Sequence, residues 1–314
     1  ERVQLLKMGF KTLMGESDEQ GLRTTLPEAE ENEKLKTSGG ENCARPNRRI
    51  IECACGHTSR IGRETEWSSR CDVIRITEDD DLTKDAGVKK GLRACGRKMP
   101  TLVMGSLPCT GASPWQHVNI HKGISTVQKI QAEREQWEIM MDGWLKIADR
   151  NHKCGGYLLF EIPSGCGYWS HPKVIGMCEK YGLVKAEAHG CMYGLVSQAP
   201  KTAGVPIKKP WTFATNSPYL RSMLFRVCDR KHKHTPCAGL DTKITEGYTD
   251  ELVSTIHQAW ALQTLDDVDY RVNTGVKVYP AMSATRQSTI MLHHGFSKSP
   301  TDVCVAVTEL YKTA

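Results

Sequence analysis

A short apolar run without a charged residue, residues 101–107, limits the fold of this chain more than any other stretch. Such a run is typical of a strand buried on both faces of a parallel sheet. It leads directly into Pro108, Cys109 and a series of small residues that ends at Ser113. Open α/β sheets bind their ligands at the carboxyl ends of the strands, so the run predicts a thiol at that edge. The alternative is that Cys109 is a small buried hydrophobic residue, which is the commoner role of cysteine.

A second run of the same kind follows at residues 156–162 and carries Glu161 near its end. An acid at the end of a buried strand is expensive to desolvate unless it has a partner or a ligand. The carboxyl ends of parallel strands meet at one edge of a sheet. We therefore expect the Cys109 thiol and the Glu161 carboxyl to lie at the same edge.

Pro108-Cys109, followed by a Phe-Glu-Ile-Pro stretch around Glu161, resembles the Pro-Cys and Glu-Asn-Val motifs of DNA cytosine-5 methyltransferases, in the same order. The chain departs from the family in having Thr110 where glutamine is usual and Ile162 where asparagine is usual. The resemblance implies a class I α/β methyltransferase fold, the cofactor S-adenosylmethionine (SAM), and methylation of cytosine at C5 in nucleic acid, with DNA favoured over RNA.

The chemistry of that reaction explains why a cysteine and an acid are needed. Carbon 5 of cytosine is too electron-poor to take a methyl cation, but a thiolate that adds to C6 makes C5 nucleophilic. The resemblance gives this role to Cys109, and it gives Glu161 the role of holding the base and protonating or hydrogen-bonding N3. The target base must leave its stack to reach both groups. The resemblance also implies that Pro108 borders the cofactor and Ser113 the substrate.

Residues 48–56 predict a further strand that ends in a glycine-bearing turn. An acid near the end of a strand, followed by glycine, resembles the first motif of class I methyltransferases. By this resemblance Glu52, Gly56, Ser59 and Gly62 would contact SAM, since glycine lets the backbone approach a cofactor closely. The alternative is an ordinary turn, because most turns of this kind bind nothing.

An acidic segment follows the next predicted strand, residues 71–77. An acid just beyond the second strand of a Rossmann-type unit commonly binds ribose hydroxyls. Glu78 or Asp79 is our candidate for that contact, and Asp81 is the candidate near the adenine. A solvated charge run that caps a helix over residues 85–95 is about equally consistent with the pattern.

The rest of the predicted sheet and its helices follow from hydrophobic spacing. An apolar stripe over residues 125–150 predicts the longest helix and indicates core packing rather than a cofactor site. Beyond it we expect a helix at 172–181, a strand at 183–187 and a last strand at 208–216. The Gly-Cys-Met-Tyr-Gly turn at 190–194 and the Lys-Pro-Trp stretch at 209–211 resemble phage and mobile-element relatives of the cytosine methyltransferases. The resemblance covers roughly residues 48 to 240.

Basic residues are expected around the reactive thiol. An electropositive surrounding lowers the pKa of a thiol and holds a phosphate backbone. Arg60, Lys208 and Lys209 are the candidates for this role.

A cysteine- and histidine-rich segment lies after the last predicted strand. Cys228, His232, His234 and Cys237 supply four ligands suited to a tetrahedral zinc site. Two histidines at i and i+2 are unusual in a structural zinc site, and a ten-residue loop that closes on one ion is tight. A basic patch that contacts phosphate, or simple surface histidines, are the alternatives.

Composition sets broad bounds on this reading. The 314 residues carry a net charge of +6, which is compatible with nucleic acid but is far weaker than the charge of an arginine-rich arm. The 13 cysteines lack the regular spacing of a secreted disulfide scaffold, and no apolar run reaches membrane-spanning length. We therefore expect an intracellular protein, nuclear or cytoplasmic. The first residue is not methionine, which predicts a piece of a longer polypeptide.

The sequence predicts four regions. Residues 1–47 read as disordered or linker, because they are charged and poor in large apolar residues, with one short amphipathic helix at 5–13. Residues 48–225 would form a Rossmann-like methyltransferase sheet with helices on both faces, and residues 226–262 a small Cys/His-bearing appendage that includes a helix at 249–262. Residues 263–314 would be a linker or the edge of another domain.

Two other functions are consistent with the same residues. A catalytically inactive methyltransferase-like module could bind nucleic acid or act as a scaffold in a mobile-element polyprotein. The glycine-poor first motif, the missing asparagine after Glu161 and the lack of a target-recognition domain and of a Gln-x-Arg-x-Arg motif favour that reading. A zinc-dependent nuclease built on the Cys/His segment is least favoured, because no paired carboxylates lie nearby in the sequence.

Overall fold

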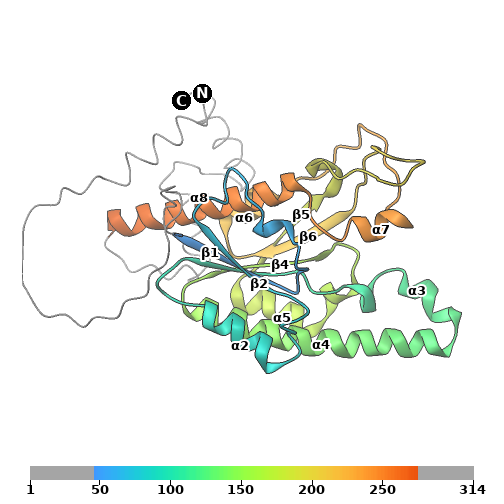
Figure 1. The fold of residues 1–314 in the computed structure, drawn as a ribbon, viewed down its shortest axis with the longest axis horizontal. Coiled ribbons are helices and arrows are strands. Elements are labelled where there is room, and N and C mark those ends of the chain that lie inside the picture. The colour runs from blue at the N-terminus through green and yellow to red at the C-terminus, as the bar shows by residue number, and fades with distance from the viewer. Residues whose placement is uncertain (1–45, 275–314) are drawn as a thin grey trace, which may run out of the picture. The chain divides into compact units, whose positions relative to one another are not determined.

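A mixed six-stranded sheet forms the centre of the computed structural model, which describes residues 46–274 (Figure 1). The chain segments at 1–45, including the helix predicted at 5–13, and at 275–314 lie outside the described residues. The strands are β1 (Arg48–Cys53), β2 (Cys71–Ile76), β3 (Thr101–Gly105), β4 (Tyr157–Pro163), β5 (Val184–His189) and β6 (Pro210–Thr215). Each overlaps a strand that the sequence predicted.

The strands follow the order β2-β1-β3-β4-β6-β5. Strands β1 to β4 pair in parallel, with Ile50 opposite Leu102 and Leu102 opposite Tyr157. The last strand, β6, is inserted between β4 and β5 and runs antiparallel to both. This order brings the ends of β1, β3 and β4, at Cys53, Gly105 and Pro163, to one edge of the sheet.

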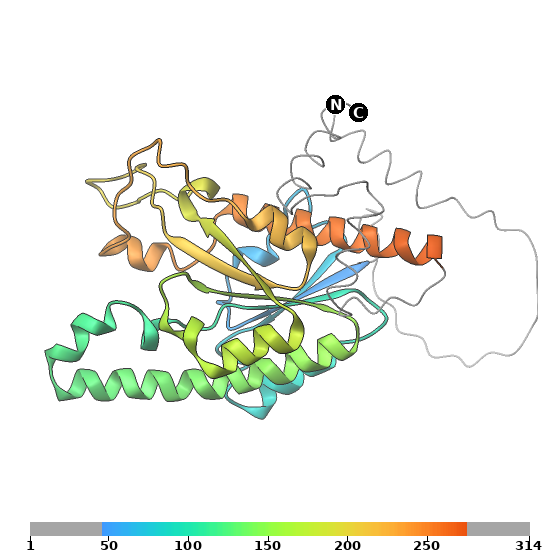
Figure 2. The same ribbon diagram turned by 180° about the vertical axis from the view of Figure 1, so that it is seen from behind.

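Helices cover both faces of this sheet (Figures 1 and 2). Short 3-10 turns connect several of the elements. The helices are α2 (Asp85–Ala94), α3 (Gln116–Asn119), α4 (Ile124–Lys153), α5 (Pro172–Tyr181), α6 (Pro218–Leu224), α7 (Leu240–Ile244) and α8 (Asp250–Thr274).

One face of the sheet packs against α2, α4 and α5. The apolar stripe of α4 is buried there, with Trp137 and Trp144 in the core. Trp144 lies directly over Gly105, where an added Cβ would come within 2.4 Å of the indole nitrogen. A glycine at the end of β3 is therefore required by the packing of α4.

The opposite face packs against α6 and α8. Leu252, Ile256 and Trp260 are fully buried and share a core with Ile50 and Leu102. The helix predicted at 249–262 is confirmed, and it continues to 274. The segment at 226–262, predicted to be a small Cys/His-bearing appendage, thus also packs onto the sheet through α8 and is part of its second core.

The predicted α/β class and the layout of helices on both faces are confirmed by the described residues. The chain forms a mixed six-stranded sheet with a Cys/His group near its carboxy-terminal part. Within residues 46–274, no helix combines the length and apolar character needed to cross a bilayer.

Candidate functional site

Cys109 lies in the loop after β3 and begins a short 3-10 turn, Thr110–Ala112. Two side chains hold this turn by its backbone: Gln116 Nε2 donates to the Thr110 carbonyl at 2.8 Å, and Arg134 Nε donates to the Gly111 carbonyl at 2.8 Å. The thiol is half-buried. The loop thus presents a cysteine at the carboxyl edge of the sheet, as its place after a buried strand predicted.

The surroundings of Cys109 favour the neutral thiol. Burial raises the pKa of Cys109, and the nearby Glu161 carboxylate raises it further, whereas the positive charge of Lys209 lowers it. A second thiol lies close by, since the Cys166 sulfur is 3.9 Å from the Cys109 carbonyl oxygen. The charges of Glu161 and Lys209 thus both influence the pKa of Cys109, in opposite directions.

Glu161 lies in β4, two residues before the strand ends at Pro163, and its side chain is buried, with 7% exposed. Its Oε2 accepts hydrogen bonds from Tyr248 Oη at 2.8 Å and Ser106 Oγ at 3.1 Å. Its Oε1 is buried and has no hydrogen-bond partner in the structure. Burial raises the pKa of Glu161, and the hydrogen bonds and Lys209 only partly oppose this.

Lys209, at the start of the segment that leads into β6, is the cation of this cluster. Its Nζ donates to the Thr245 carbonyl, which fixes the side chain beside the carboxyl edge. Lys209 was expected near the thiol, and its charge does act on both Cys109 and Glu161. No sequence pattern pointed to Ser106 or Tyr248, because both come close to Glu161 only through the fold.

Glu52 is the buried acid at the neighbouring position of the same edge. Ser59 Oγ donates to Glu52 Oε1 at 2.5 Å. Glu52 Oε2 lies 4.0 Å from Arg75 Nε and has no hydrogen-bond partner. Burial raises the pKa of Glu52, and Ser59 opposes the rise. The two predicted glycines differ: a Cβ at Gly56 would meet open space, whereas a Cβ at Gly62 would clash with the Arg75 guanidinium.

The acids that follow β2 have different surroundings. Glu78 is exposed, and Asp79 pairs with His57 at 3.2 Å. Asp81 has a positive φ and accepts hydrogen bonds from the backbone and side chain of Thr83, which helps to lower its pKa to about 2. Asp81 is thus engaged in the turn before α2 and does not cap the helix, whose first residue is preceded by Lys84 without a side-chain cap.

Arg60, also expected near the thiol, contacts the chain around Tyr248 instead. Its NH1 donates to the Tyr248 carbonyl at 3.1 Å and lies 3.6 Å from an oxygen of Asp250. Lys208 is half-buried, and its carbonyl accepts from the Gly190 amide at 2.6 Å. Arg60 therefore helps to hold the segment that presents Tyr248 to Glu161.

Ser113, expected to contact substrate, lines a cleft of about 700 Å³ between the loop after β3, α4 and the 3-10 turn before α5. In this cleft His171 Nε2 lies 2.6 Å from Glu138 Oε1. Next to it, Trp115 is 65% exposed, and α3 lies beside the start of α4 in both ribbon views (Figures 1 and 2). The other exposed apolar side chains of this region are Val118, Ile120, Ile124 and Val127.

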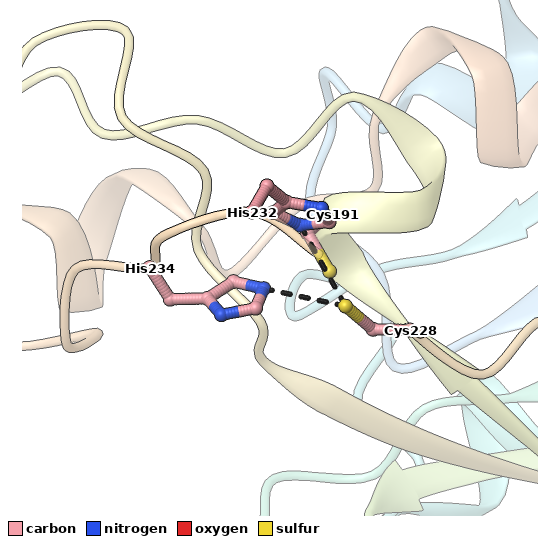
Figure 3. Close-up of side chains that lie close together, drawn as sticks. All are labelled: Cys191, Cys228, His232 and His234. Atoms are coloured by element: carbon pink, nitrogen blue, oxygen red, sulfur yellow. Dashed lines mark hydrogen bonds between the residues drawn. The ribbon is translucent and has the colours of Figure 1, made fainter. Parts of the chain in front are cut away.

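The Cys/His residues also converge, but in a different combination from the expected one. Cys191, Cys228, His232 and His234 place one ligand atom each within 4.8 Å of one another and could hold a metal ion (Figure 3). Cys237, the fourth ligand expected from the sequence, is not in this group. Its sulfur lies 3.2 Å from Thr245 Oγ1, next to α7.

A scan against protein-family models, a search of curated proteins and a search of solved structures each found no significant match to this chain.

Proposed function

We propose that this chain transfers a methyl group from SAM to C5 of cytosine in nucleic acid, with DNA favoured over RNA. The observation that carries the proposal is that Cys109, in the loop after β3, and Glu161, near the end of β4, lie at the same edge of the sheet, where the charge of Lys209 acts on both. The buried and unpartnered Oε1 of Glu161 supports a ligand at this point, because a buried polar atom without a partner costs free energy.

The raised pKa of Glu161 suits its role. A carboxyl that keeps its proton to higher pH can donate that proton to N3 of cytosine. Protonation of N3 draws electrons from C6, where the Cys109 thiolate adds and forms the S–C6 bond. The neutral Glu161 no longer raises the pKa of Cys109, so the proton on Glu161 also favours the thiolate. Release requires loss of the C5 proton and cleavage of the S–C6 bond.

The neighbouring residues fit a bound SAM. Glu52, near the carboxyl end of β1, has a buried oxygen without a hydrogen-bond partner, the space above Gly56 is open, and Glu78 is exposed after β2. These residues would hold the ribose and the amino-acid part of the cofactor, and Ser59 orients Glu52. When bound, SAM supplies the methyl group.

The order of the strands favours a ligand at one edge of the sheet. Strands β1 to β4 run parallel, and β6 runs antiparallel between β4 and β5. A sheet of this kind places its ligands at the carboxyl ends of the parallel strands, where Cys109 and Glu161 lie.

Nucleic acid is the proposed substrate because a base and a phosphate backbone match the side chains around the edge. Exposed Trp115 follows the Cys109 loop and offers a flat surface on which a base can stack. Lys209, whose charge acts on both Cys109 and Glu161, and the preceding Lys208 supply positive charge for phosphates.

Methyl transfer from labelled SAM to DNA and to RNA of varied sequence tests the proposal. Wild-type protein should label cytosine C5, and Cys109→Ser should not. The matched control is Cys166→Ser, which removes the nearest other thiol. Labelling that survives in Cys109→Ser and is lost in Cys166→Ser contradicts the assigned nucleophile.

The second candidate is an inactive module that binds nucleic acid, and the neutral state of the thiol favours it. Burial and Glu161 both raise the pKa of Cys109, which lowers the thiolate fraction at neutral pH. This candidate predicts binding of DNA or RNA that Cys109→Ser leaves unchanged, together with no methyl transfer.

A further inference from the structure

Four possible metal ligands from two separate segments meet beside the edge strand β5. Cys191 comes from the 3-10 turn Gly190–Tyr193 that follows β5, and the other three come from the loop after α6. Figure 3 shows the Cys191 and Cys228 thiols and the His232 and His234 rings facing a common point. The cluster lies apart from Cys109 and Glu161 in sequence, and the proposed methyl transfer does not use it.

The distances within this cluster match a tetrahedral zinc ion. With Zn–S of about 2.3 Å and Zn–N of about 2.05 Å, tetrahedral geometry puts a sulfur and a nitrogen ligand about 3.6 Å apart. The Cys228 sulfur lies 3.6 Å from His232 Nε2 and 3.5 Å from His234 Nε2. One thiol proton cannot be donated to two imidazole nitrogens at once, so a shared ion accounts for the arrangement better than hydrogen bonds do.

The backbone around Cys228 supports a thiolate. The Arg230 amide points at the Cys228 sulfur at 3.3 Å, and Arg230 has a φ of 64°, which turns the chain so that this contact forms. The Cys228 amide donates to His189 Nδ1 at 2.9 Å. Contacts of this kind orient the ligands of a metal and stabilise a charged sulfur.

The geometry points to one structural zinc ion bound by Cys191, Cys228, His232 and His234, which joins the loop 228–237 to the turn after β5. Two sulfur and two nitrogen ligands in tetrahedral arrangement favour zinc over the harder divalent cations. Four protein ligands leave no open position, which is typical of a structural ion rather than a catalytic one. Two thiolates balance the two charges of the ion.

The proposed zinc site would also stabilise the segment that carries Lys209. The Gly190 amide donates to the Lys208 carbonyl at 2.6 Å, and the Thr235 amide donates to the Pro206 carbonyl at 3.0 Å. The segment 206–209 is thus hydrogen-bonded both to the turn after β5 and to the loop after α6, which supply the four ligands. Loss of the ion should therefore loosen this part of the carboxyl edge.

Zinc content and cysteine protection in the full 314-residue chain test this inference. Protein purified without chelator under reducing conditions should contain one zinc per chain. Cobalt substitution should give the absorption bands of tetrahedral cobalt with thiolate ligands. Differential alkylation, read by peptide mass spectrometry, should show Cys191 and Cys228 protected with zinc and reactive after chelation. Cys237 should not need chelation to react, because it is not a ligand.

Variants separate the two possible ligand sets. Even outer-shell changes commonly weaken metal binding about 10–100-fold, so loss of a ligand in Cys191→Ser should weaken zinc binding by more than that. The control Cys237→Ser should bind zinc as wild type does. If Cys191→Ser fails to fold, the alkylation pattern of the wild type decides.

Three results would overturn the inference. They are a wild-type chain that binds no zinc when zinc is supplied, a disulfide between Cys191 and Cys228 in its place, and protection of Cys237 rather than Cys191. None of these readouts depends on methyl transfer, so the zinc site and the proposed function can fail separately.

Discussion

Replacing Tyr248 with phenylalanine should destabilise the protein more at high pH than at low pH. The buried Tyr248 hydroxyl donates to the buried Glu161 Oε2 at 2.8 Å. A hydrogen bond to a charged group contributes about 1.5–3 kcal/mol, and one between neutral groups contributes about 0.5–1.5 kcal/mol. The cost of the substitution should therefore rise from about 1 kcal/mol when Glu161 is protonated to about 2 kcal/mol when it is ionised.

The sign follows from proton linkage. Burial raises the pKa of Glu161 above its usual value of 4.5, so the folded protein retains a proton that the unfolded chain has lost. This carboxyl therefore lowers stability as the pH rises from that value through its folded pKa. The Tyr248 hydrogen bond opposes the raised pKa. Without it, the pKa of Glu161 rises further, and the fall in stability is steeper and extends to higher pH.

Urea unfolding between about pH 5 and about pH 8 measures this difference. The matched control is Tyr193→Phe, because the buried Tyr193 hydroxyl donates only to the carbonyls of Met223 and Leu224. Its substitution should cost about 1 kcal/mol at every pH. In a Glu161→Gln background, the pH dependence of the Tyr248→Phe effect should disappear. An equal loss at both ends of the range, or a pH dependence in the control, would refute the reasoning.

Three further predictions test other parts of the structure. Glu161→Gln should speed alkylation of Cys109 by iodoacetamide at neutral pH, because the carboxylate that raises the thiol pKa is gone; equal rates by peptide mass spectrometry would argue against their proximity. Asp81→Ala should cost about 1 kcal/mol in urea unfolding, because the turn loses its hydrogen bonds to Thr83, and leave any SAM-induced thermal shift unchanged. Gly105→Ala should lower stability by about 1–3 kcal/mol, because its Cβ meets the Trp144 indole; a neutral effect would show that α4 can move away.

Much of the fold could be predicted because its central strands β3 and β4 are buried along nearly their whole length and its long helix carries an apolar stripe. A charge-free run such as β3 has few alternatives, and the stripe of α4 repeats over many turns. The same reasoning placed Cys109 and Glu161 at one edge, since both follow from the ends of buried strands. The role of α8 in the core could not be inferred from the spacing of its apolar residues. That spacing indicates that one face of the helix is buried, but it does not indicate which element covers that face.

The partners of the site residues depended on contacts between distant segments. Cys237 is nearer in sequence to the two histidines than Cys191 is, yet its thiol turns toward Thr245. Cys191 reaches the cluster because β5 and the loop after α6 are bonded side by side: the His189 amide donates to the Arg226 carbonyl at 2.9 Å. Such pairing leaves no mark in local sequence, so the ligand set required the fold.

Covalent trapping on cytosine is the most direct test of the central claim that Cys109 is a nucleophile toward C6. A fluorine at C5 cannot leave as a proton does, so the S–C6 bond has no route to break after methylation. Wild-type protein with SAM and DNA containing 5-fluorocytosine should give an adduct that survives denaturing electrophoresis and maps to Cys109. The adduct should be absent in Cys109→Ser and reduced in Glu161→Gln. An adduct that persists in Cys109→Ser, or none on DNA or RNA across varied sequence contexts, would contradict the account.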